Sequence, residues 1–268
     1  MKNILEAKNL VKEYSQTQGF FSRTKNIIRA LSQVSISIEK GKTLAVVGES
    51  GSGKSTLAKS LIKLIEVDDG SIYFEGVHLN SLTSDELKST RRNIQMVFQD
   101  PYASLNPRMK IKDILEEPLI IHNIDVTSGR QKKIKEMIIR VGLGEDDLKK
   151  YPHEFSGGQR QRIGIARALI LSPKLVICDE PVSALDVSVQ AQIIQLLKSL
   201  QKEFELTYLF ITHDLRIVRH IADRVFVMKE GELMEQGKTD IIFNNPKTAY
   251  TKELLASIPG NRKLKRNK

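Results

Sequence analysis

Short apolar runs alternate with longer amphipathic stretches along this chain of 268 residues. Such alternation predicts an α/β fold whose helices connect the strands of a mainly parallel sheet. Residues 43–47 read as a buried strand, and residues 55–65 read as a helix with leucines and isoleucines on one face. The same reasoning predicts strands at 175–178 and 208–211, helices at 189–204 and 215–221, and a hairpin of 225–229 with 232–235.

Two regions depart from this alternation. Near the N-terminus, residues 4–10, 34–38 and 71–74 alternate only partly, which favours an antiparallel sheet. Between residues 99 and 156 the chain is punctuated by prolines, and residues 111–121 and 131–141 read as helices. We therefore expect a helical insertion in the α/β core.

Composition and charge narrow the choice of partner and compartment. Hydrophobic residues make up 40% of the chain and charged residues 28%, which is usual for a globular protein with a sizeable core. No apolar run is long enough to span a bilayer and no signal-peptide core is present, so the chain is expected in the cytoplasm. The net charge of +10 favours acidic partners such as a nucleotide, a nucleic acid or an anionic membrane face. The basic residues are densest at 262–268, where we favour a solvated tail over contact with lipid or nucleic acid.

The single cysteine, Cys178, excludes an internal disulfide and a cysteine-clustered metal site. It lies inside an apolar run. We therefore interpret it as a small buried hydrophobe.

A glycine-rich loop follows the strand at 43–47. Residues 48–55 fit the pattern G-x-x-x-x-G-K-S, in which successive backbone N–H groups wrap a polyphosphate. Lys54 is placed to reach the β- and γ-phosphates of a nucleotide, and the Ser55 hydroxyl to bind Mg²⁺. The alternative is a glycine-rich turn that binds nothing. The glycines that permit this close approach are Gly48, Gly51 and Gly53.

Two carboxylates directly follow the apolar run at 175–178. Ionised side chains at this place are costly unless they meet a metal ion or a proton-transfer task. Asp179 is expected to hold Mg²⁺ through its water shell, and Glu180 to polarise the attacking water as a general base. The alternative is a solvated turn.

A second loop resembles an anion site. Ser156, Gly157, Gly158 and Gln159 precede the amphipathic stretch 160–171, and a serine with two glycines at a helix start can bind an anion. The alternative is an ordinary helix cap. Two phosphate loops far apart in one chain suggest that two chains share each nucleotide.

Two further polar residues lie where the predicted core changes direction. His213 follows a predicted strand and could donate to the γ-phosphate. Gln99 lies where the core gives way to the helical insertion, and is suited to linking Mg²⁺ and water to another subunit.

Taken together, these motifs resemble those of the ATP-binding subunit of ATP-binding-cassette (ABC) transporters over almost the whole chain. The motifs that carry the resemblance are Walker A at 48–55, the Q-loop at Gln99, the signature at 156–159, Walker B at 175–180, the D-loop at 183–186 and the switch His213. The resemblance implies a RecA-like parallel-sheet core with an N-terminal antiparallel β subdomain and a helical subdomain. It places the core at 1–98 and 172–245, the helical subdomain at 99–171, and a C-terminal extension at 246–268.

The resemblance also assigns residue roles. It implies a head-to-tail dimer of cassettes, with each ATP between Walker A of one and the signature of the other. Tyr14 would stack on the adenine ring, although residues 16–28 look like an insertion before Walker A. Phe155 stands where the signature usually begins with leucine. The implied catalytic residues are Glu180, His213, Gln99 and Lys54, and the implied Mg²⁺ ligands are Ser55, Gln99 and Asp179. The implied ATP contacts are Tyr14, Gly48, Glu49, Ser50, Gly51, Ser52, Gly53, Lys54, Ser55, Thr56, Ser156, Gly157, Gly158, Gln159 and Asp186.

A narrower resemblance is to the importers of peptides and nickel. It rests on residues 97–108, 151–162, 180–188 and 244–255. The chain lacks the C-terminal cysteine cluster of one cassette type, so it resembles the other, the F-type oligopeptide/dipeptide permease subunit. The implied partners are a second cassette (a D-type paralogue, otherwise a second copy), two membrane permease subunits and, indirectly, an extracellular solute-binding protein. The chain would then lie on the cytoplasmic side of the membrane.

Other functions stay open at this point. The same role could serve a nickel or other small-solute importer, since the resemblance implies that this subunit does not contact the solute. An ABC ATPase acting on nucleic acid or ribosomes is a second class, but the long coiled coil typical of many such proteins is not present. A nucleotide-binding regulator without turnover is a third class, which Glu180 and His213 argue against.

The loop after Gln99 is the expected contact with the membrane subunits. Its prolines restrict the backbone, so movement at Gln99 should pass to the following segment. In the importers that the chain resembles, a short cytoplasmic helix of each membrane subunit docks into a groove beside this loop. The resemblance therefore implies that Tyr102, Leu105 and Met109 contact that helix, with Arg108 at the rim. The competing interpretation is that these side chains pack inside the helical insertion.

Overall fold

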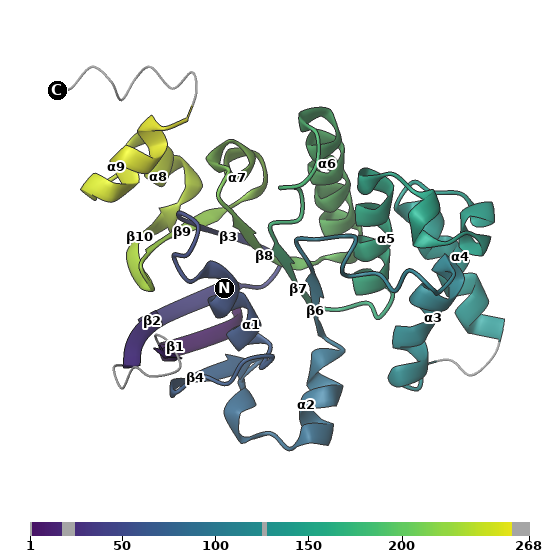
Figure 1. Cartoon of the computed structure of the whole chain (residues 1–268), viewed down its shortest axis with the longest axis horizontal. Coiled ribbons are helices and arrows are strands. Elements are labelled where there is room, and N and C mark those ends of the chain that lie inside the picture. Colours follow the sequence, from purple (N-terminus) through teal and green to yellow (C-terminus); the bar gives the residue numbers. More distant parts are fainter. Residues whose placement is uncertain (1, 18–24, 125–127, 259–268) are drawn as a thin grey trace. The chain divides into compact units, whose positions relative to one another are not determined.

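The structure is a computed structural model of the whole chain and describes residues 2–17, 25–124 and 128–258 (Figure 1). The chain forms two compact units, one of Met1–Thr83 with Leu209–Lys268 and one of 84–208. Strand β8 (Thr207–Thr212) begins in the second unit and ends in the first. The basic stretch 262–268 lies outside the described residues.

The N-terminal part of the first unit is a four-stranded antiparallel sheet. Its strands are β1 (Asn3–Thr17), β2 (Lys25–Glu39), β4 (Asp69–Phe74) and β5 (Val77–His78), in the order β2-β1-β4-β5. Buried Leu5 and Ala7 alternate with the more exposed Glu6 and Lys8 along β1, as expected when one face of a sheet is covered. The expected antiparallel sheet is confirmed.

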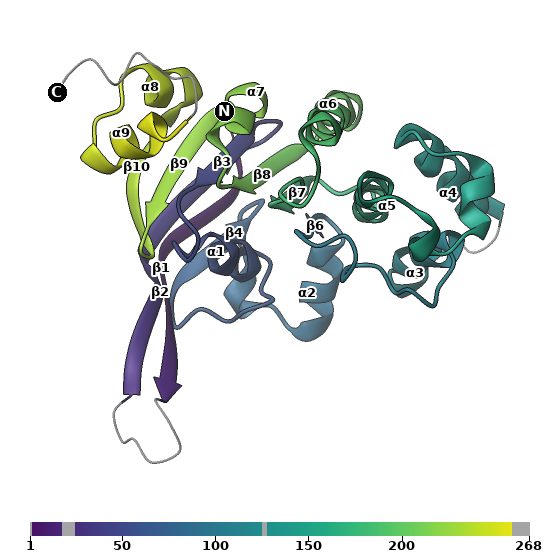
Figure 2. The same cartoon turned by 45° about the horizontal axis from the view of Figure 1, so that its top comes forward.

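Strands β1 and β2 are longer than the sequence predicted. The stretch 16–28 that looks like an insertion continues these strands at its described ends, because Gln16 and Thr17 belong to β1 and residues 25–28 belong to β2. Strand β4 pairs with β1 only from Leu5 to Val11, so the ends of β1 and β2 extend past it as a two-stranded hairpin (Figure 2). Partial alternation over these residues concealed the strand signal, since a two-stranded hairpin has no buried face.

A second set of strands in the first unit lies in the order β10-β9-β3-β8. Strand β3 (Thr43–Val47) is buried throughout and runs parallel to β9 (Arg224–Lys229). Strand β10 (Glu232–Lys238) returns antiparallel to β9 across Glu230 and Gly231, whose positive φ angles of 47° and 80° suit a tight hairpin turn. The predicted hairpin is confirmed.

The α-helices among the described residues of this unit are α1 (Lys54–Leu61), α7 (Leu215–Ile221), α8 (Thr239–Asn244) and α9 (Ala249–Ala256). Helix α1 ends before the predicted residue 65, and Lys63 has a positive φ of 56° that a continuing helix does not allow. Apolar side chains of β3 and β9, such as Ala45 and Val227, pack with α7, α8 and α9 in one buried cluster.

The second unit is mainly helical. Strands β6 (Ile94–Val97) and β7 (Leu175–Asp179) pair in parallel, and Cys178 within β7 is fully buried, as predicted. Helix α5 packs against β6, α6 and the pair α3 and α4. The α-helices described in this unit are α2 (Ser84–Arg91), α3 (Ile111–Ile121), α4 (Ser128–Arg140), α5 (Gly157–Leu169) and α6 (Val187–Phe204). Short 3₁₀ helices are η2 (Glu145–Lys149) and η3 (Pro152–Glu154) in this unit and η1 (Leu79–Ser81) in the first.

Among the described residues, no helix is both long and apolar enough to cross a membrane. The helices predicted at 111–121 and 131–141 correspond to α3 and α4. The boundaries predicted for the core, the helical subdomain and the C-terminal extension stay a prediction.

Candidate functional site

The glycine-rich loop joins β3, which ends at Val47, to α1, which begins at Lys54. Two of its glycines are required by close contacts. A Cβ atom on Gly48 would lie 2.1 Å from the Met228 carbonyl oxygen at the end of β9. One on Gly53, whose φ is 99°, would lie 2.3 Å from the Ala30 oxygen of β2. The loop is therefore held between two strands at distances that only glycine permits.

Lys54 is 5% exposed and reaches into this loop. Its Nζ donates hydrogen bonds to the carbonyl oxygens of Gly48, at 2.8 Å, and Glu49, at 2.7 Å. The ammonium group is thus bound to the backbone of the loop that was predicted to surround a phosphate. The first turn of α1 adds its partial positive charge, so the loop is suited to bind an anion.

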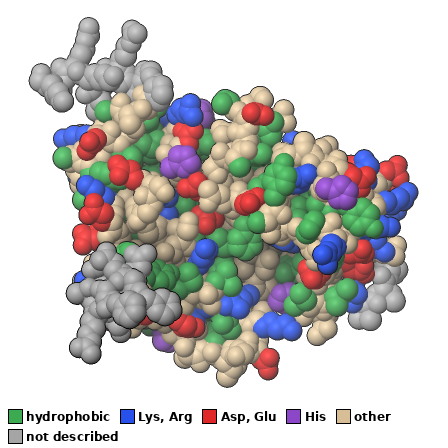
Figure 3. All heavy atoms as spheres, in the orientation of Figure 1, with side chains coloured by type: hydrophobic (Ala, Val, Ile, Leu, Met, Phe, Trp, Pro, Cys, Tyr) green, Lys and Arg blue, Asp and Glu red, His purple; other side chains and the backbone are tan. Residues whose placement is uncertain are grey.

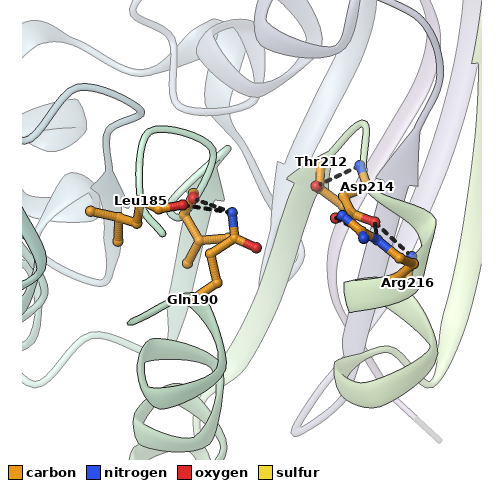
Figure 4. Close-up of polar contacts among 6 residues, drawn as sticks. Leu185, Gln190, Thr212, Asp214 and Arg216 are labelled. Atoms are coloured by element: carbon orange, nitrogen blue, oxygen red, sulfur yellow. Dashed lines mark hydrogen bonds and ion pairs between the residues drawn. The ribbon is translucent and has the colours of Figure 1, made fainter. Parts of the chain in front are cut away.

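His213 follows β8 and is exposed. The turn that carries it is fixed on both sides (Figure 4). The Thr212 hydroxyl accepts a hydrogen bond from the Asp214 N–H at 3.0 Å, and the Asp214 carboxylate caps α7 by accepting from the Arg216 N–H at 2.9 Å. The Arg216 guanidinium also donates to Asp214 and, as the main cause, lowers the pKa of that carboxyl. His213 is therefore presented at the strand end by a rigid turn.

Tyr14 lies on the long β1–β2 hairpin, where it pairs with Ile28 of β2. Its side chain is 40% exposed, and the Lys12 ammonium lies 5.6 Å from the ring centre. The side chain of Asp68 accepts from Lys12 Nζ and from the Glu13 N–H at the base of this hairpin. An exposed aromatic ring on an ordered strand is compatible with stacking on a base, which stays a prediction.

Asp179 and Glu180 lie at the end of β7, in the second unit. Asp179 is 5% exposed. Glu180 has a positive φ of 46°, which is uncommon for a residue with a side chain and is often found at functional sites. The Gln99 Nε2 donates to Glu180 Oε2 at 3.3 Å, so the ends of the paired strands β6 and β7 bring these two predicted residues together.

The donor atoms predicted for Mg²⁺ fit that ion chemically, because it prefers oxygen ligands. Ser55 offers a hydroxyl and Asp179 a carboxylate. The Gln99 amide uses its nitrogen for Glu180, which leaves its oxygen as the donor for a metal ion. Within the described residues, no group of three or more histidine, cysteine and acidic side chains forms a metal cluster.

The segment between β7 and α6 is held by one side chain. Gln190 Nε2 donates to the carbonyl oxygens of Val182, at 3.1 Å, and Leu185, at 2.9 Å (Figure 4). Asp186 then occupies the N-cap position of α6 and is exposed. The predicted D-loop is thus a defined turn that presents Asp186 to solvent.

The signature residues form the start of α5. Ser156 and Gln159 make a reciprocal capping box: the Ser156 hydroxyl accepts from the Gln159 N–H, and the Gln159 side chain accepts from the Ser156 N–H at 2.9 Å. The hydrogen bonds of an ordinary helix cap, which was the alternative interpretation, are therefore present. A role in binding a second nucleotide stays a prediction.

The two signature glycines pack closely on the D-loop and α6. A Cβ atom on Gly157 would lie 3.3 Å from Leu185 Cδ2, and one on Gly158 would lie 2.5 Å from Val189 Cγ1. The glycines are thus explained by packing within the unit as well as by any anion they bind.

The predicted residues fall into two groups. The glycine-rich loop (with Glu49, Ser50, Ser52 and Thr56), Tyr14 and His213 belong to the first unit, and Gln99, Asp179, Glu180, Asp186 and the signature belong to the second. Sequence reasoning missed residues that form hydrogen bonds to the loop. The Gly231 N–H donates to the Ser52 oxygen at 3.1 Å, and the Glu49 N–H donates to the Tyr250 hydroxyl oxygen at 3.3 Å.

The expectation that Leu105 contacts a permease helix is wrong. Leu105 is 1% exposed and belongs to the core of the second unit, as the competing interpretation held. Tyr102 is 62% exposed, and its ring lies 3.8 Å from the Arg160 guanidinium carbon. The prolines around Leu105 gave the segment the pattern of a surface loop, which concealed that one of its side chains points inward.

Comparison with known proteins gives matches over the whole chain. The family model described as ABC transporter matches residues 31–183, which is more than half of the chain. A second model, described as the C-terminal region of oligopeptide/dipeptide transporters, matches residues 234–268.

Curated relatives cover nearly all of the chain. The oligopeptide transport ATP-binding protein AppF of Bacillus subtilis is 51% identical over 263 residues, which are 98% of this chain and 80% of that relative. OppF of Haemophilus influenzae is 52% identical over 251 residues, or 93% of this chain and 75% of the relative. The dipeptide transport ATP-binding protein DppF of Escherichia coli is 50% identical over 256 residues, or 96% and 76%.

Solved structures share the fold. The dimeric cassette MJ0796, in a post-hydrolysis state bound to ADP and Pi, has a TM-score of 0.77 and 34% identity, covering 88% of this chain and 98% of that one. CbiO1 of Clostridium perfringens has a TM-score of 0.78 and 30% identity, covering 91% and 92%. The α/β cassette fold expected from the sequence is confirmed. Because a family model matches more than half of its length and relatives near half identity cover nearly all of it, the chain belongs to the ABC transporter family as one of its ATP-binding cassettes.

Proposed function

We propose that the chain is the ATP-hydrolysing subunit of a bacterial importer of oligopeptides or dipeptides. The observation that carries the proposal is the contact between Gln99 and Glu180 beside the buried Asp179, because it assembles the parts needed to activate water at a strand end. The peptide substrate is supported by the names of the relatives and by the C-terminal family match at 234–268.

The chemistry follows from the residue positions. Lys54 exchanges its hydrogen bonds with the loop carbonyls for bonds to the β- and γ-phosphates of ATP, where charge assistance makes them stronger. Ser55 and Asp179, with the Gln99 oxygen, would hold Mg²⁺, and the ion would supply neutralisation of phosphate charge. Glu180 accepts the proton of the attacking water, and His213 donates to the γ-phosphate. Tyr14 stacks on the adenine.

A second cassette completes each nucleotide site. Ser156–Gln159 and Asp186 serve the ATP held by the partner, which is a D-type paralogue or a second copy of this chain. The dimeric state of MJ0796 supports this arrangement. The reciprocal Ser156 and Gln159 bonds keep the start of α5 ordered, and that helix start offers partial positive charge to the partner's phosphate.

The cassettes drive two membrane permease subunits from the cytoplasmic side, and an extracellular binding protein delivers the solute. A specific nucleic-acid partner is not part of the proposal. On the face shown in Figure 3, lysine and arginine side chains are interspersed with acidic ones, as on an ordinary soluble surface.

The experiment is reconstitution of the complex with both permease subunits and the binding protein in liposomes. We expect peptide to raise the rate of ATP hydrolysis and to accumulate inside the liposomes only with ATP. If nickel but not peptide raises the rate of ATP hydrolysis, the substrate is nickel and the proposed peptide substrate is wrong. Nucleic acid that stays bound at high salt would favour the non-transport class, since phosphate contacts weaken steeply with salt.

A further inference from the structure

A residue of helix α9 is hydrogen-bonded to the phosphate loop. Tyr250 of α9 is 8% exposed, and its hydroxyl oxygen accepts a hydrogen bond from the Glu49 N–H at 3.3 Å. The Glu49 carbonyl oxygen, on the other side of the same residue, accepts from Lys54 Nζ at 2.7 Å. A single loop residue therefore connects Tyr250 to the lysine proposed to bind ATP.

The position of Tyr250 is fixed by its surroundings. Its ring packs in the buried cluster with Ala45 and Val47, the β3 residues that lead into the phosphate loop. The Lys229 ammonium lies 5.1 Å from the ring centre. Burial, as the main cause, raises the pKa of the Tyr250 hydroxyl, so the group stays neutral and keeps its proton.

Hydrogen bonds also hold the start of α9 in place. Glu235 of β10 accepts hydrogen bonds from the backbone N–H groups of Lys247, at 2.9 Å, and Thr248, at 3.1 Å. The Thr248 hydroxyl in turn caps α9 by accepting from the Thr251 N–H at 3.1 Å. Helix α9 cannot shift along the sheet without breaking these bonds, so the Tyr250 hydroxyl has a defined place.

From these contacts we propose that Tyr250 is a positioning residue for the phosphate loop. It holds the peptide group between Gly48 and Glu49 in place, so that the loop backbone and the ammonium of Lys54 stay arranged to receive a phosphate. The C-terminal region, which lies beyond the match to the general ABC transporter model, thereby sets nucleotide affinity. This inference rests on the proposed function, namely that ATP binds at this loop.

The test is the substitution Tyr250→Phe, which keeps the ring and removes only the hydroxyl. Tyr208→Phe is the matched control, because the Tyr208 hydroxyl is also buried and donates to the Leu197 oxygen at 3.0 Å in the other unit. MgATP affinity of the purified full chain is measured by calorimetry, together with the melting temperature. We expect Tyr250→Phe to weaken MgATP binding by about three- to ten-fold, the range for one lost hydrogen bond. Tyr208→Phe should lower the melting temperature as much as Tyr250→Phe does, but it should leave the MgATP affinity unchanged.

A second variant and a reference keep the result decisive. Thr248→Val removes the cap of α9 while leaving Tyr250 intact, and should weaken MgATP binding in the same direction. In turnover assays of the complex, Tyr250→Phe should raise KM for ATP more than it lowers kcat. Wild-type affinity in both Tyr250→Phe and Thr248→Val overturns the inference. Lys54→Ala serves as the reference: if it too binds ATP normally, the proposed nucleotide site itself is wrong.

Discussion

Gln99 donates to Glu180 across 3.3 Å, from a position two residues beyond β6 to a position one residue beyond β7. The two strands pair in parallel, so their carboxyl ends meet at one edge of the sheet, where ligands bind in open α/β sheets. The Gln99 amide therefore orients the carboxylate that we assign to water activation, and links it to the segment that continues into the helical part of the second unit.

The first prediction concerns that carboxylate. Glu180→Gln keeps the shape and a hydrogen-bonding partner for Gln99 but removes the proton acceptor. We expect ATP binding to persist and hydrolysis to fall by about 10²–10⁴-fold. ATP should then trap a closed dimer, which size-exclusion chromatography with and without nucleotide detects. Near-normal hydrolysis by Glu180→Gln would remove this residue from the role of base.

The second prediction concerns Lys54. Lys54→Ala removes the charge that acts on the phosphates in the ground state, so nucleotide affinity itself should fall, unlike in Glu180→Gln. Because Lys54 also bonds to two loop carbonyls, the melting temperature is recorded alongside. Unchanged affinity in a nucleotide titration would count against the assignment.

The third prediction separates charge from packing at the signature. Gly157→Asp places a carboxylate where the partner's γ-phosphate is proposed to lie, and like charges repel. We expect hydrolysis to be impaired while ATP binding to the isolated chain stays intact. Gly157→Ala is the control, since its methyl group presses on Leu185 at 3.3 Å without adding charge. Equal loss of hydrolysis in both variants would mean that the loop acts through packing alone.

A fourth prediction tests the docking surface, now without buried Leu105. Tyr102→Asp should reduce assembly with the permease subunits and transport, while basal ATPase activity and melting temperature are retained. Ile139→Asp is the control, because Ile139 is similarly exposed, at 54%, on α4. A Tyr102→Asp complex that still couples ATP hydrolysis fully to transport would contradict the docking role.

The last prediction is a pH dependence of stability at Glu235. Burial alone would raise the pKa of this carboxyl, but hydrogen bonds from the Lys247 and Thr248 N–H groups and nearby hydroxyls lower it below the ordinary 4.5. A depressed pKa means that the stabilisation is present above the ordinary value and is lost as pH falls through the folded value. Glu235→Gln should therefore lower the free energy of unfolding by about 1–3 kcal/mol at neutral pH.

The difference should shrink towards acid pH, as urea unfolding of both proteins from neutral pH to about pH 3 would show. A difference between wild type and Glu235→Gln that is independent of pH would mean that the carboxylate charge does not contribute.

The sequence predicted the elements that have a strong period or a clear chemical motif. Strand β3, helices α3 and α7 and the β9–β10 hairpin follow from apolar spacing and from Glu230-Gly231. It did not predict α2, in which no residue is buried, because a helix without an apolar face carries no periodic signal. Candidate catalytic residues could be named from the sequence because their types and order are distinctive, and their roles stay a prediction.

The residues that hold the glycine-rich loop in place were not predicted from the sequence, for a physical reason. Tyr250 reaches Glu49 from 201 positions away in the chain, and Gly231 reaches Ser52 from a hairpin turn. Such contacts depend on tertiary packing, which no local pattern encodes. The burial of Leu105 was kept only as the competing interpretation for the same reason, since burial of one side chain in a proline-rich loop leaves no periodic trace.

Cys178 makes the wild-type chain suitable for site-specific spectroscopy. It is the single cysteine, it is fully buried in β7, and burial raises the pKa of its thiol, so little reactive thiolate forms at neutral pH. Cysteines introduced at exposed Ile139 and Lys252, one in each unit, would be labelled without first removing the native one. The distance between such a pair of labels, followed by fluorescence transfer during ATP turnover, would test whether the separation of the two labelled sites changes.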